Sequence, residues 1–324
     1  MDINNIQSDI AYEWQFFQKL MRESLESSSS LLNTINSFLL NNKGKQIRPL
    51  LTILSAKACG KSNDLSISCA AVSEMIHTAT LLHDDVADNA YQRRGLPTVH
   101  ATYNAAASIL TGDFWLAKAL SHMVKKNCPE ILGYFAKTIE DLSEGELFQM
   151  QKANNLDATE EDYYKIIYGK TASLFVASVK SAAYSVSPTA EVLEKMEVFA
   201  RHLGIAFQIR DDIFDYMPQL NTGKAAGGDI KERKITLPLI CALSSCTESE
   251  KQSLYNSLRG TPEDDEKLVA EATALIDRYS GIEKAQKALL EHCQKAEDCL
   301  GILEDSVYKT DLIQLTRFVG QREI

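Results

Sequence analysis

The sequence contains few of the residues that interrupt helices. Only seven prolines and fifteen glycines occur among 324 residues. Both residue types disfavour a helix interior, so their scarcity leaves room for long helices. No segment of useful length alternates apolar and polar residues as a half-buried strand would, and we find neither a repeat nor a long linker. We therefore expect one all-α domain over residues 1–324.

Cysteine patterns typical of a disulfide framework or a zinc site are also missing. The seven cysteines are scattered and form no Cys-x-x-Cys pair. This usage indicates reduced cysteines in a cytoplasmic protein. The opening residues MDINNIQSDIAYEW lack a signal-peptide pattern, and no run approaches the ~20 apolar residues of a membrane span. We expect at most transient membrane contact.

A basic surface is absent as well. The formal net charge is -10 at pH 7 and no basic stripe is present. Nucleic-acid binders carry such a stripe, so nucleic acid is not an expected partner. Hydrophobic periodicity instead predicts helices over 7–40 (bent at 27–30), 49–58, 66–89, 103–126, 129–153, 159–184, 188–216, 235–245, 248–258, 263–278, 280–301 and 305–320.

Two acidic clusters lie inside apolar helical segments and share the pattern Asp-Asp-x-x-Asp. They are Asp84, Asp85 and Asp88 in LLHDDVADNAYQRRG, and Asp211, Asp212 and Asp215 in FQIRDDIFDY. The first and last Asp of each triad share a helix face, where like charges repel. A magnesium ion removes that repulsion and prefers such oxygen ligands. One triad alone is typical of a solvated acidic face, but two matched triads favour facing walls of one metal site.

In each predicted helix, the residues one to two turns before the triad are small or mildly polar. His77, Ala79 and Thr80 precede the first triad, and Gly204 and Gln208 precede the second. A core helix would be expected to fill this face with Leu or Phe. The pattern predicts a pocket with a charged mouth and a narrow lower part.

Basic residues near the triads suit an anionic ligand such as a diphosphate. Each of them alone is more often a surface charge. A glycine-rich stretch, NTGKAAGGDIKERK, has the wrong spacing for a P-loop, and we interpret it as a mobile flap. The cations concerned are Lys43, Lys45 and Arg48, Arg93 and Arg94, Lys170, and Lys224, Arg233 and Lys234.

Taken together, these motifs resemble the trans-isoprenyl diphosphate synthases, and within them the long-chain polyprenyl type. The resemblance runs from about Lys43 to Pro238. Its motifs are GKxxRP at 44–49, HDDxxDxxxxRRG at 83–95, GD at 112–113, KT at 170–171, FQxxDDxxD at 207–215, GK at 223–224 and KxTLP at 234–238. The family has an all-α bundle around a central cleft and is usually homodimeric.

The resemblance implies a magnesium-dependent condensation of isopentenyl diphosphate with an allylic diphosphate, using three ions. It implies that Asp84, Asp88 and Asp211 hold the metal, with Asp85, Asp212 and Asp215 in support. The allylic diphosphate would be bound by Arg93, Lys170, Lys224 and Lys234. Isopentenyl diphosphate would be bound by Lys45, Arg48, His77 and Arg94, and the space between the substrates would be lined by Thr171, Gln208 and Phe207.

Chain length and three departures from the family pattern complete the prediction. Ala79 lies ~7.5 Å down the helix from Asp84, and with Thr80 it leaves room for a growing tail, which favours a long product of about thirty to fifty carbons. Plain helix packing is the alternative for Ala79.

Lys43 and Arg233 replace glycines of the family and add positive charge near phosphate, and Gly228 replaces an Asp.

Four alternatives compete with this prediction. A short-chain (geranylgeranyl or farnesyl) diphosphate synthase would share the chemistry but stop earlier. A non-catalytic partner subunit would be expected to lose a triad, and a terpene cyclase needs no isopentenyl diphosphate site. An HD-type phosphohydrolase would use His83 and Asp84 with other histidines converging on a metal, and would leave the second triad unused.

Overall fold

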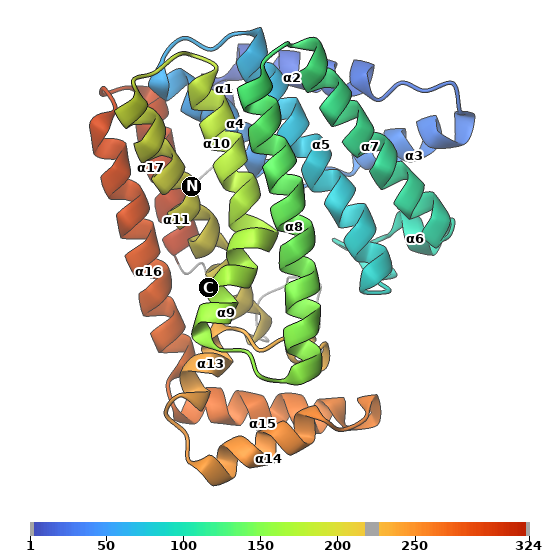
Figure 1. Cartoon of the computed structure of the whole chain (residues 1–324), viewed down its shortest axis with the longest axis vertical. Helices are drawn as coiled ribbons and strands as arrows, with labels where there is room; N and C mark the ends of the chain where they lie inside the picture. The colour runs from blue at the N-terminus through green and yellow to red at the C-terminus, as the bar shows by residue number, and fades with distance from the viewer. Residues whose placement is uncertain (1–2, 218–226, 322–324) are drawn as a thin grey trace. The chain divides into compact units, whose positions relative to one another are not determined.

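The computed structural model describes residues 3–217 and 227–321. It is almost entirely helical, as expected (Figure 1). The predicted phosphate ligand Lys224 lies outside the described residues, as do the other residues of 221–226 in the glycine-rich stretch. The two short strands, β1 (Gln92–Arg93) and β2 (Leu96–Pro97), pair antiparallel in the loop after the first triad.

The helix bounds agree with the periodicity within a few residues over most of the chain. The helices are α1 (Ile3–Asp9), α2 (Ala11–Ser24), α3 (Ser30–Asn41), α4 (Ile47–Cys59), α5 (Asp64–Ala87), α6 (Val99–Thr102), α7 (Ala105–Lys125), α8 (Pro129–Asn155), α9 (Glu160–Ile167), η1 (Tyr168–Ala172), α10 (Ser173–Tyr184), α11 (Ala190–Asp215), α12 (Gly228–Lys231), α13 (Leu237–Leu243), α14 (Glu248–Leu258), η2 (Pro262–Asp264), α15 (Asp265–Arg278), α16 (Gly281–Cys299), η3 (Leu300–Ile302) and α17 (Val307–Gly320).

Two predicted helices were too long. The segment predicted as one helix over 7–40 is broken between α2 and α3, where Asn33 exchanges hydrogen bonds with the backbone of Ser27 and Ser29 caps Leu32. Such local side-chain bonds compete with helical backbone bonds. The segment 159–184 is divided by the five-residue π-helix η1, which periodicity alone does not reveal.

The chain divides into two compact units, each built from separate segments. Unit 1 contains residues 1–139, 174–200 and 299–315, and unit 2 contains 140–173, 201–298 and 316–324. Their boundaries fall inside helices α8, α10, α11, α16 and α17 rather than in loops. The first triad belongs to unit 1 and the second to unit 2, and each is described within its own unit.

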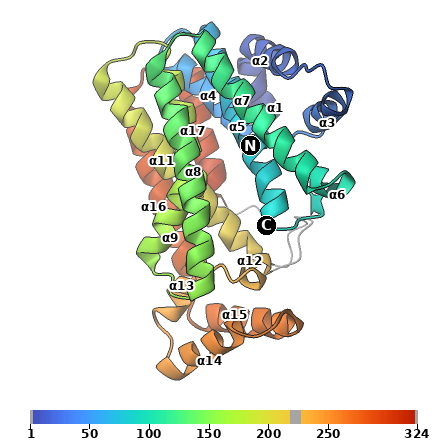
Figure 2. The same cartoon turned by 45° about the vertical axis from the view of Figure 1, so that its right-hand side comes forward.

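In unit 1, helix α5 packs along α7, and the two lie side by side in both views (Figures 1 and 2). Gly112 on α7 permits this approach, because a Cβ there would lie 2.3 Å from the His83 ring and 3.1 Å from the Ala79 carbonyl oxygen. On another side α5 meets α10, where Ser73 and Ser178 share a hydrogen bond of 2.5 Å. By length and composition α5 could cross a membrane, but 72% of its apolar stretch is buried inside the protein, as in a core helix.

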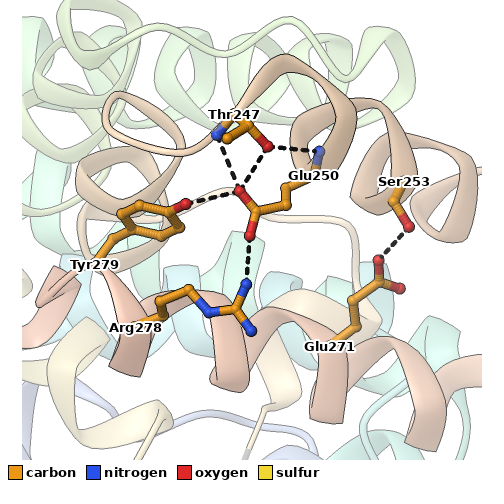
Figure 3. Close-up of polar contacts among 6 residues, drawn as sticks. All are labelled: Thr247, Glu250, Ser253, Glu271, Arg278 and Tyr279. Carbon is orange, nitrogen blue, oxygen red and sulfur yellow. Dashed lines mark hydrogen bonds and ion pairs between the residues drawn. The ribbon is translucent and has the colours of Figure 1, made fainter.

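In unit 2, polar side chains join the helix pair α14 and α15 (Figure 3). Thr247 caps α14 by accepting the Glu250 N–H, and the Glu250 carboxylate accepts hydrogen bonds from Thr247, Tyr279 and Arg278. The bond from Tyr279, followed by those from Thr247, lowers the pKa of Glu250 to about 2. The carboxylate therefore stays ionised near neutral pH and continues to accept these bonds.

Candidate active site

The first triad ends helix α5 and does not present its three carboxylates equally. Asp84 is half-buried and Asp88 is exposed at the helix C-cap. Asp85 is only 4% exposed and accepts a 2.7 Å hydrogen bond from Arg93 Nε. Burial raises the pKa of Asp85, while the adjacent Arg93 guanidinium acts in the opposite direction. Arg93, predicted as a phosphate ligand, thus also anchors the middle Asp.

The second triad, near the end of α11, repeats this arrangement with different partners. The Asp211 side chain is 44% exposed, and Asp215 is half-buried. Asp212 is 3% exposed and accepts hydrogen bonds from Tyr163 Oη at 2.6 Å and Gln208 Nε2 at 2.7 Å. Burial raises the pKa of Asp212, and the neighbouring Asp229 carboxylate raises it further. In both triads the middle carboxylate is therefore held by the protein.

The first residues described after the gap at 218–226 hydrogen-bond to the second triad. Asp215 accepts hydrogen bonds from the backbone N–H groups of Gly228 at 3.2 Å and Asp229 at 3.0 Å. These two N–H groups open helix α12, where an acceptor is otherwise lacking. This contact brings Asp229 and Lys234 to a pocket of unit 2, whose other lining residues include Tyr163, Lys170, Thr171, Gln208, Asp212 and Arg233.

Lys170 and Thr171 stand on the π-helix η1, which is held against α8 by two glycines. A Cβ on Gly145 would lie 2.9 Å from the backbone nitrogen of Lys170, and one on Gly169 would lie 2.8 Å from the Asp141 carbonyl oxygen. From α8, Glu146 pairs with Lys170 at 2.5 Å. Thr171 donates a 2.6 Å hydrogen bond to Gln208, which places it beside the second triad. Gln208 and Phe207 were predicted to line the same space. The Phe207 ring centroid lies 4.9 Å from the Arg210 guanidinium carbon.

A cationic cluster forms in unit 1 from residues predicted to bind the second substrate. Arg48 Nη1 donates to His77 Nε2 at 3.2 Å, and a Cβ on Gly44 would lie 2.4 Å from Arg94 Nη1. Because an arginine only donates, His77 Nε2 is the acceptor and this histidine is neutral. Burial, and then the charge of Arg48, keep the pKa of His77 well below its ordinary value.

A buried carboxylate stands at this cluster. Glu74 is buried on α5, and Gln46 donates to it at 3.4 Å. Burial raises the pKa of Glu74, and the charges of Arg48 and Arg94 oppose that rise. The structure thus brings Arg48, His77 and Arg94 together, with exposed Lys45 on the loop before α4.

The two residues predicted to control chain length differ in their surroundings. Ala79 is fully buried and its carbonyl is next to Gly112, whereas Thr80 is half-buried and donates to the His77 carbonyl at 2.9 Å. The packing explanation for Ala79 therefore has direct structural support. His83, required by the phosphohydrolase alternative, lies 3.3 Å from both Asp113 and the Ile109 carbonyl oxygen on α7.

The donor set suits a cation that also takes ligands from a substrate. Within residues 3–217 and 227–321, no three His, Cys, Asp or Glu side chains converge to form a metal cage. Magnesium characteristically binds through one or two carboxylates and completes its shell with water and phosphate oxygens. Asp84 and Asp88 of the first triad, and Asp211 of the second, are partly or fully exposed and fit that requirement. A transition metal of the zinc type would need a closed set of nitrogen or sulfur ligands.

Three residues that contact the site escaped the sequence analysis: Tyr163, Glu146 and Glu74. Tyr163 precedes Lys170 by seven positions, about two helical turns, so a search for polar residues on the Lys170 face would have found it. Glu146 and Glu74 carry no local signal, because their partners lie on other helices.

Comparisons with known proteins identify the family of the chain. The family model for polyprenyl synthetase matches residues 29–276. The chain is 34% identical to an all-trans-nonaprenyl-diphosphate synthase (geranyl-diphosphate specific) of Rhodobacter capsulatus, covering 98% of this chain and 97% of the relative. It is 32% identical to the octaprenyl diphosphate synthase of Escherichia coli over all of both chains. A solved polyprenyl synthase from Caulobacter crescentus, complexed with calcium and isoprenyl diphosphate, has a TM-score of 0.91, 30% identity and coverage of 99% and 98%.

Proposed function

The chain belongs to the polyprenyl synthetase family, and we propose that it condenses isopentenyl diphosphate with an allylic diphosphate to build a long-chain, all-trans polyprenyl diphosphate. The observation that carries this proposal is the repeated triad geometry. In each triad the middle carboxylate is buried and anchored by the protein, and the first and last carboxylates stand at one-turn spacing with partial or full exposure. Asp215 also accepts the backbone N–H groups of Gly228 and Asp229. Two such pairs suit a diphosphate bridged by divalent cations.

The allylic diphosphate is proposed to bind between the outer carboxylates and the cations near them. Asp84, Asp88 and Asp211 would hold magnesium, with Asp85, Asp212 and Asp215 in support, and three ions are expected. Bound magnesium supplies charge neutralisation for the departing diphosphate. Lys170 and Lys234 line the unit 2 pocket and would contact the same phosphates, with Arg93 contributing from the first triad. Lys224 is proposed for the same role.

Isopentenyl diphosphate is proposed to bind at the cluster of Arg48, His77 and Arg94, with Lys45. Neutral His77 accepts from Arg48 and thereby orients its guanidinium. Preorganised donors of this kind stabilise charge without reorganising during the reaction. Holding the second substrate by its phosphate orients its double bond toward the allylic carbon. The new carbon–carbon bond forms as the allylic carbon–oxygen bond breaks, and the released diphosphate takes the departing proton.

The product is proposed to be long. The relatives named above are a nonaprenyl and an octaprenyl diphosphate synthase by name, and we propose that small Ala79 and Thr80 leave room for the tail where an aromatic residue would block it. We propose a single catalytic domain, a cytoplasmic location and a homodimer.

A product assay tests the proposal. Purified protein, magnesium, farnesyl or geranyl diphosphate and labelled isopentenyl diphosphate are expected to yield products of about thirty carbons or more. Chelation by EDTA should abolish turnover, and added magnesium should restore it. Products that stop at fifteen or twenty carbons would keep the chemistry and refute the long-chain assignment. Absence of incorporation with every primer would favour the non-catalytic subunit.

A further inference from the structure

Tyr163 and Asp212 form a buried pair that the proposed chemistry does not itself require. The Tyr163 hydroxyl donates to Asp212 Oδ2 at 2.6 Å, and both residues are only 3% exposed. The other oxygen, Oδ1, accepts from Gln208 Nε2 at 2.7 Å. Gln208 Oε1 in turn accepts from Thr171 at 2.6 Å. Three short hydrogen bonds therefore join α9, η1 and α11 within unit 2.

We propose that Tyr163 is a positioning residue for the diphosphate site. By fixing Asp212, it sets the rotation of α11 relative to α9 and η1. That rotation keeps Asp211 and Asp215 in register with Lys170. This inference rests on the proposed function, because it assigns Tyr163 a role in the same site.

The geometry of a helix explains how one hydroxyl has this effect. Successive residues are about 100° apart around a helix, so an anchored Asp212 holds Asp211 on a neighbouring, more open face. Asp215 follows Asp211 by one turn and shares that face. Without the Tyr163 hydroxyl, a buried carboxylate oxygen lacks its donor, which is costly. Asp212 would turn toward water or another donor, and the end of α11 would turn with it.

The link also reaches the predicted phosphate ligand. Tyr163 and Lys170 lie about two turns apart along α9 and η1, and both line the unit 2 pocket. Glu146 holds the Lys170 ammonium at 2.5 Å from the opposite side, on α8. The lysine thus sits between a fixed carboxylate on α8 and an α11 whose rotation depends on Tyr163.

The chain offers a matched pair of substitutions. Tyr163→Phe removes only the hydroxyl and keeps the ring, which packs edge-on against Tyr164 with centroids 5.5 Å apart. Tyr164→Phe removes a hydroxyl from the next residue of the same helix, where the ring stacks on His292 at 5.7 Å. The two variants differ in whether the lost hydroxyl contacts Asp212.

Steady-state kinetics and magnesium binding test the inference. Removal of a side chain that hydrogen-bonds a metal ligand typically lowers metal affinity or activity 10–100-fold. We expect Tyr163→Phe to raise the magnesium concentration for half-maximal activity, and to lower kcat/KM for the allylic diphosphate, by roughly 10–100-fold. The KM for isopentenyl diphosphate should stay within about twofold, because the unit 1 cations are untouched. Tyr164→Phe should match the wild type in all three quantities.

A second readout does not depend on turnover. Magnesium together with inorganic diphosphate should raise the Tm of the wild type and of Tyr164→Phe, and should raise that of Tyr163→Phe much less. Equal Tm shifts and equal magnesium dependence for both variants would overturn the inference. A parallel loss of affinity for both substrates would overturn it as well. If Tyr163→Phe does not fold, Thr171→Val, which removes the donor that orients Gln208 at the other end of the same link, is expected to raise the magnesium concentration for half-maximal activity. A wild-type magnesium dependence of Thr171→Val would then overturn the inference.

An inactive wild type overturns the proposed function and not this assignment. The Tm comparison between the two tyrosine variants still decides the role of Tyr163 in that case.

Discussion

Arg233 donates a 2.8 Å hydrogen bond to Asp265, at the start of α15, and so joins the residues that follow the second triad to the α14–α15 pair. The same side chain donates to the carbonyls of Leu258 and Gly260. Arg233 has a φ of 62°, in the left-handed region that its family counterpart, a glycine, adopts easily. The sequence predicted that this charge lies near bound phosphate. In the structure the guanidinium forms an ion pair with Asp265 and, with the two carbonyls, clamps the residues beside the pocket to α14 and α15.

Removing this clamp should destabilise unit 2. Arg233→Ala loses a charge-assisted bond and leaves carbonyls without donors, so we expect the free energy of unfolding to fall by about 2–3 kcal/mol. Arg259→Ala, at an exposed arginine nearby, should change it by less than about 0.5 kcal/mol. Urea denaturation of both variants measures the difference. Equal stability of the two variants would show that the clamp is dispensable.

The glycine contact behind Lys170 should be equally intolerant of added volume. A Cβ at Gly145 would lie 2.9 Å from the backbone nitrogen of Lys170. Because that backbone belongs to η1, Gly145→Ala must push η1 away from α8. We expect a loss of about 1–3 kcal/mol in stability from overpacking, and a higher KM for the allylic diphosphate. Gly133→Ala, on the same helix with open space around its Cβ position, is the control and should not be destabilised. A Gly145→Ala enzyme with wild-type KM would contradict this account.

The His202–His292 pair should make stability depend on pH. Their Nδ1 atoms lie 3.0 Å apart, so one ring must be neutral to accept a hydrogen bond. Burial and then neighbouring cations lower the pKa of both, that of His292 to about 4. A folded-state pKa below the unfolded value of 6.5 gives stability that is present above pH 6.5 and is lost as the pH falls toward 4. With allowance for partial exposure, the loss should be on the order of 1–2 kcal/mol.

Unfolding curves of the wild type and His292→Gln between pH 7.5 and about pH 4 test this dependence. The variant has no imidazole to protonate at position 292, so its stability should change less over this interval. Parallel pH profiles for the two proteins would contradict the expectation.

Product length should shorten when the face below the first triad is filled. Thr80→Phe is the gentler test, because Thr80 is half-buried whereas Ala79 is fully buried next to α7. We expect both Thr80→Phe and Ala79→Phe to give shorter products than the wild type, with Ala79→Phe also losing about 1–3 kcal/mol in stability. Chromatography of dephosphorylated products reads the length. Unchanged length in a folded Ala79→Phe variant would assign Ala79 to packing alone.

The local sequence determined much of the fold and the identity of the site. Hydrophobic periodicity predicted α14 at its observed bounds and most other helices within a few residues, because side-chain faces repeat every turn. The spacing of each Asp-Asp-x-x-Asp triad likewise predicted that its first and last carboxylates share a face. Both inferences need only the geometry of one helix.

Tertiary structure decided how those carboxylates differ. The local spacing does not by itself separate Asp211 from Asp212, whereas in the fold Asp212 is buried and accepts a hydrogen bond from Tyr163 on another helix. Arg233 likewise has its partners in a distant segment, because it donates to the Leu258 carbonyl and to the Asp265 carboxylate. A buried polar group is stable only with a partner, and periodicity cannot identify a partner that folding brings from a distant segment. Local geometry therefore determined which residues are candidates, and long-range packing determined their separate roles.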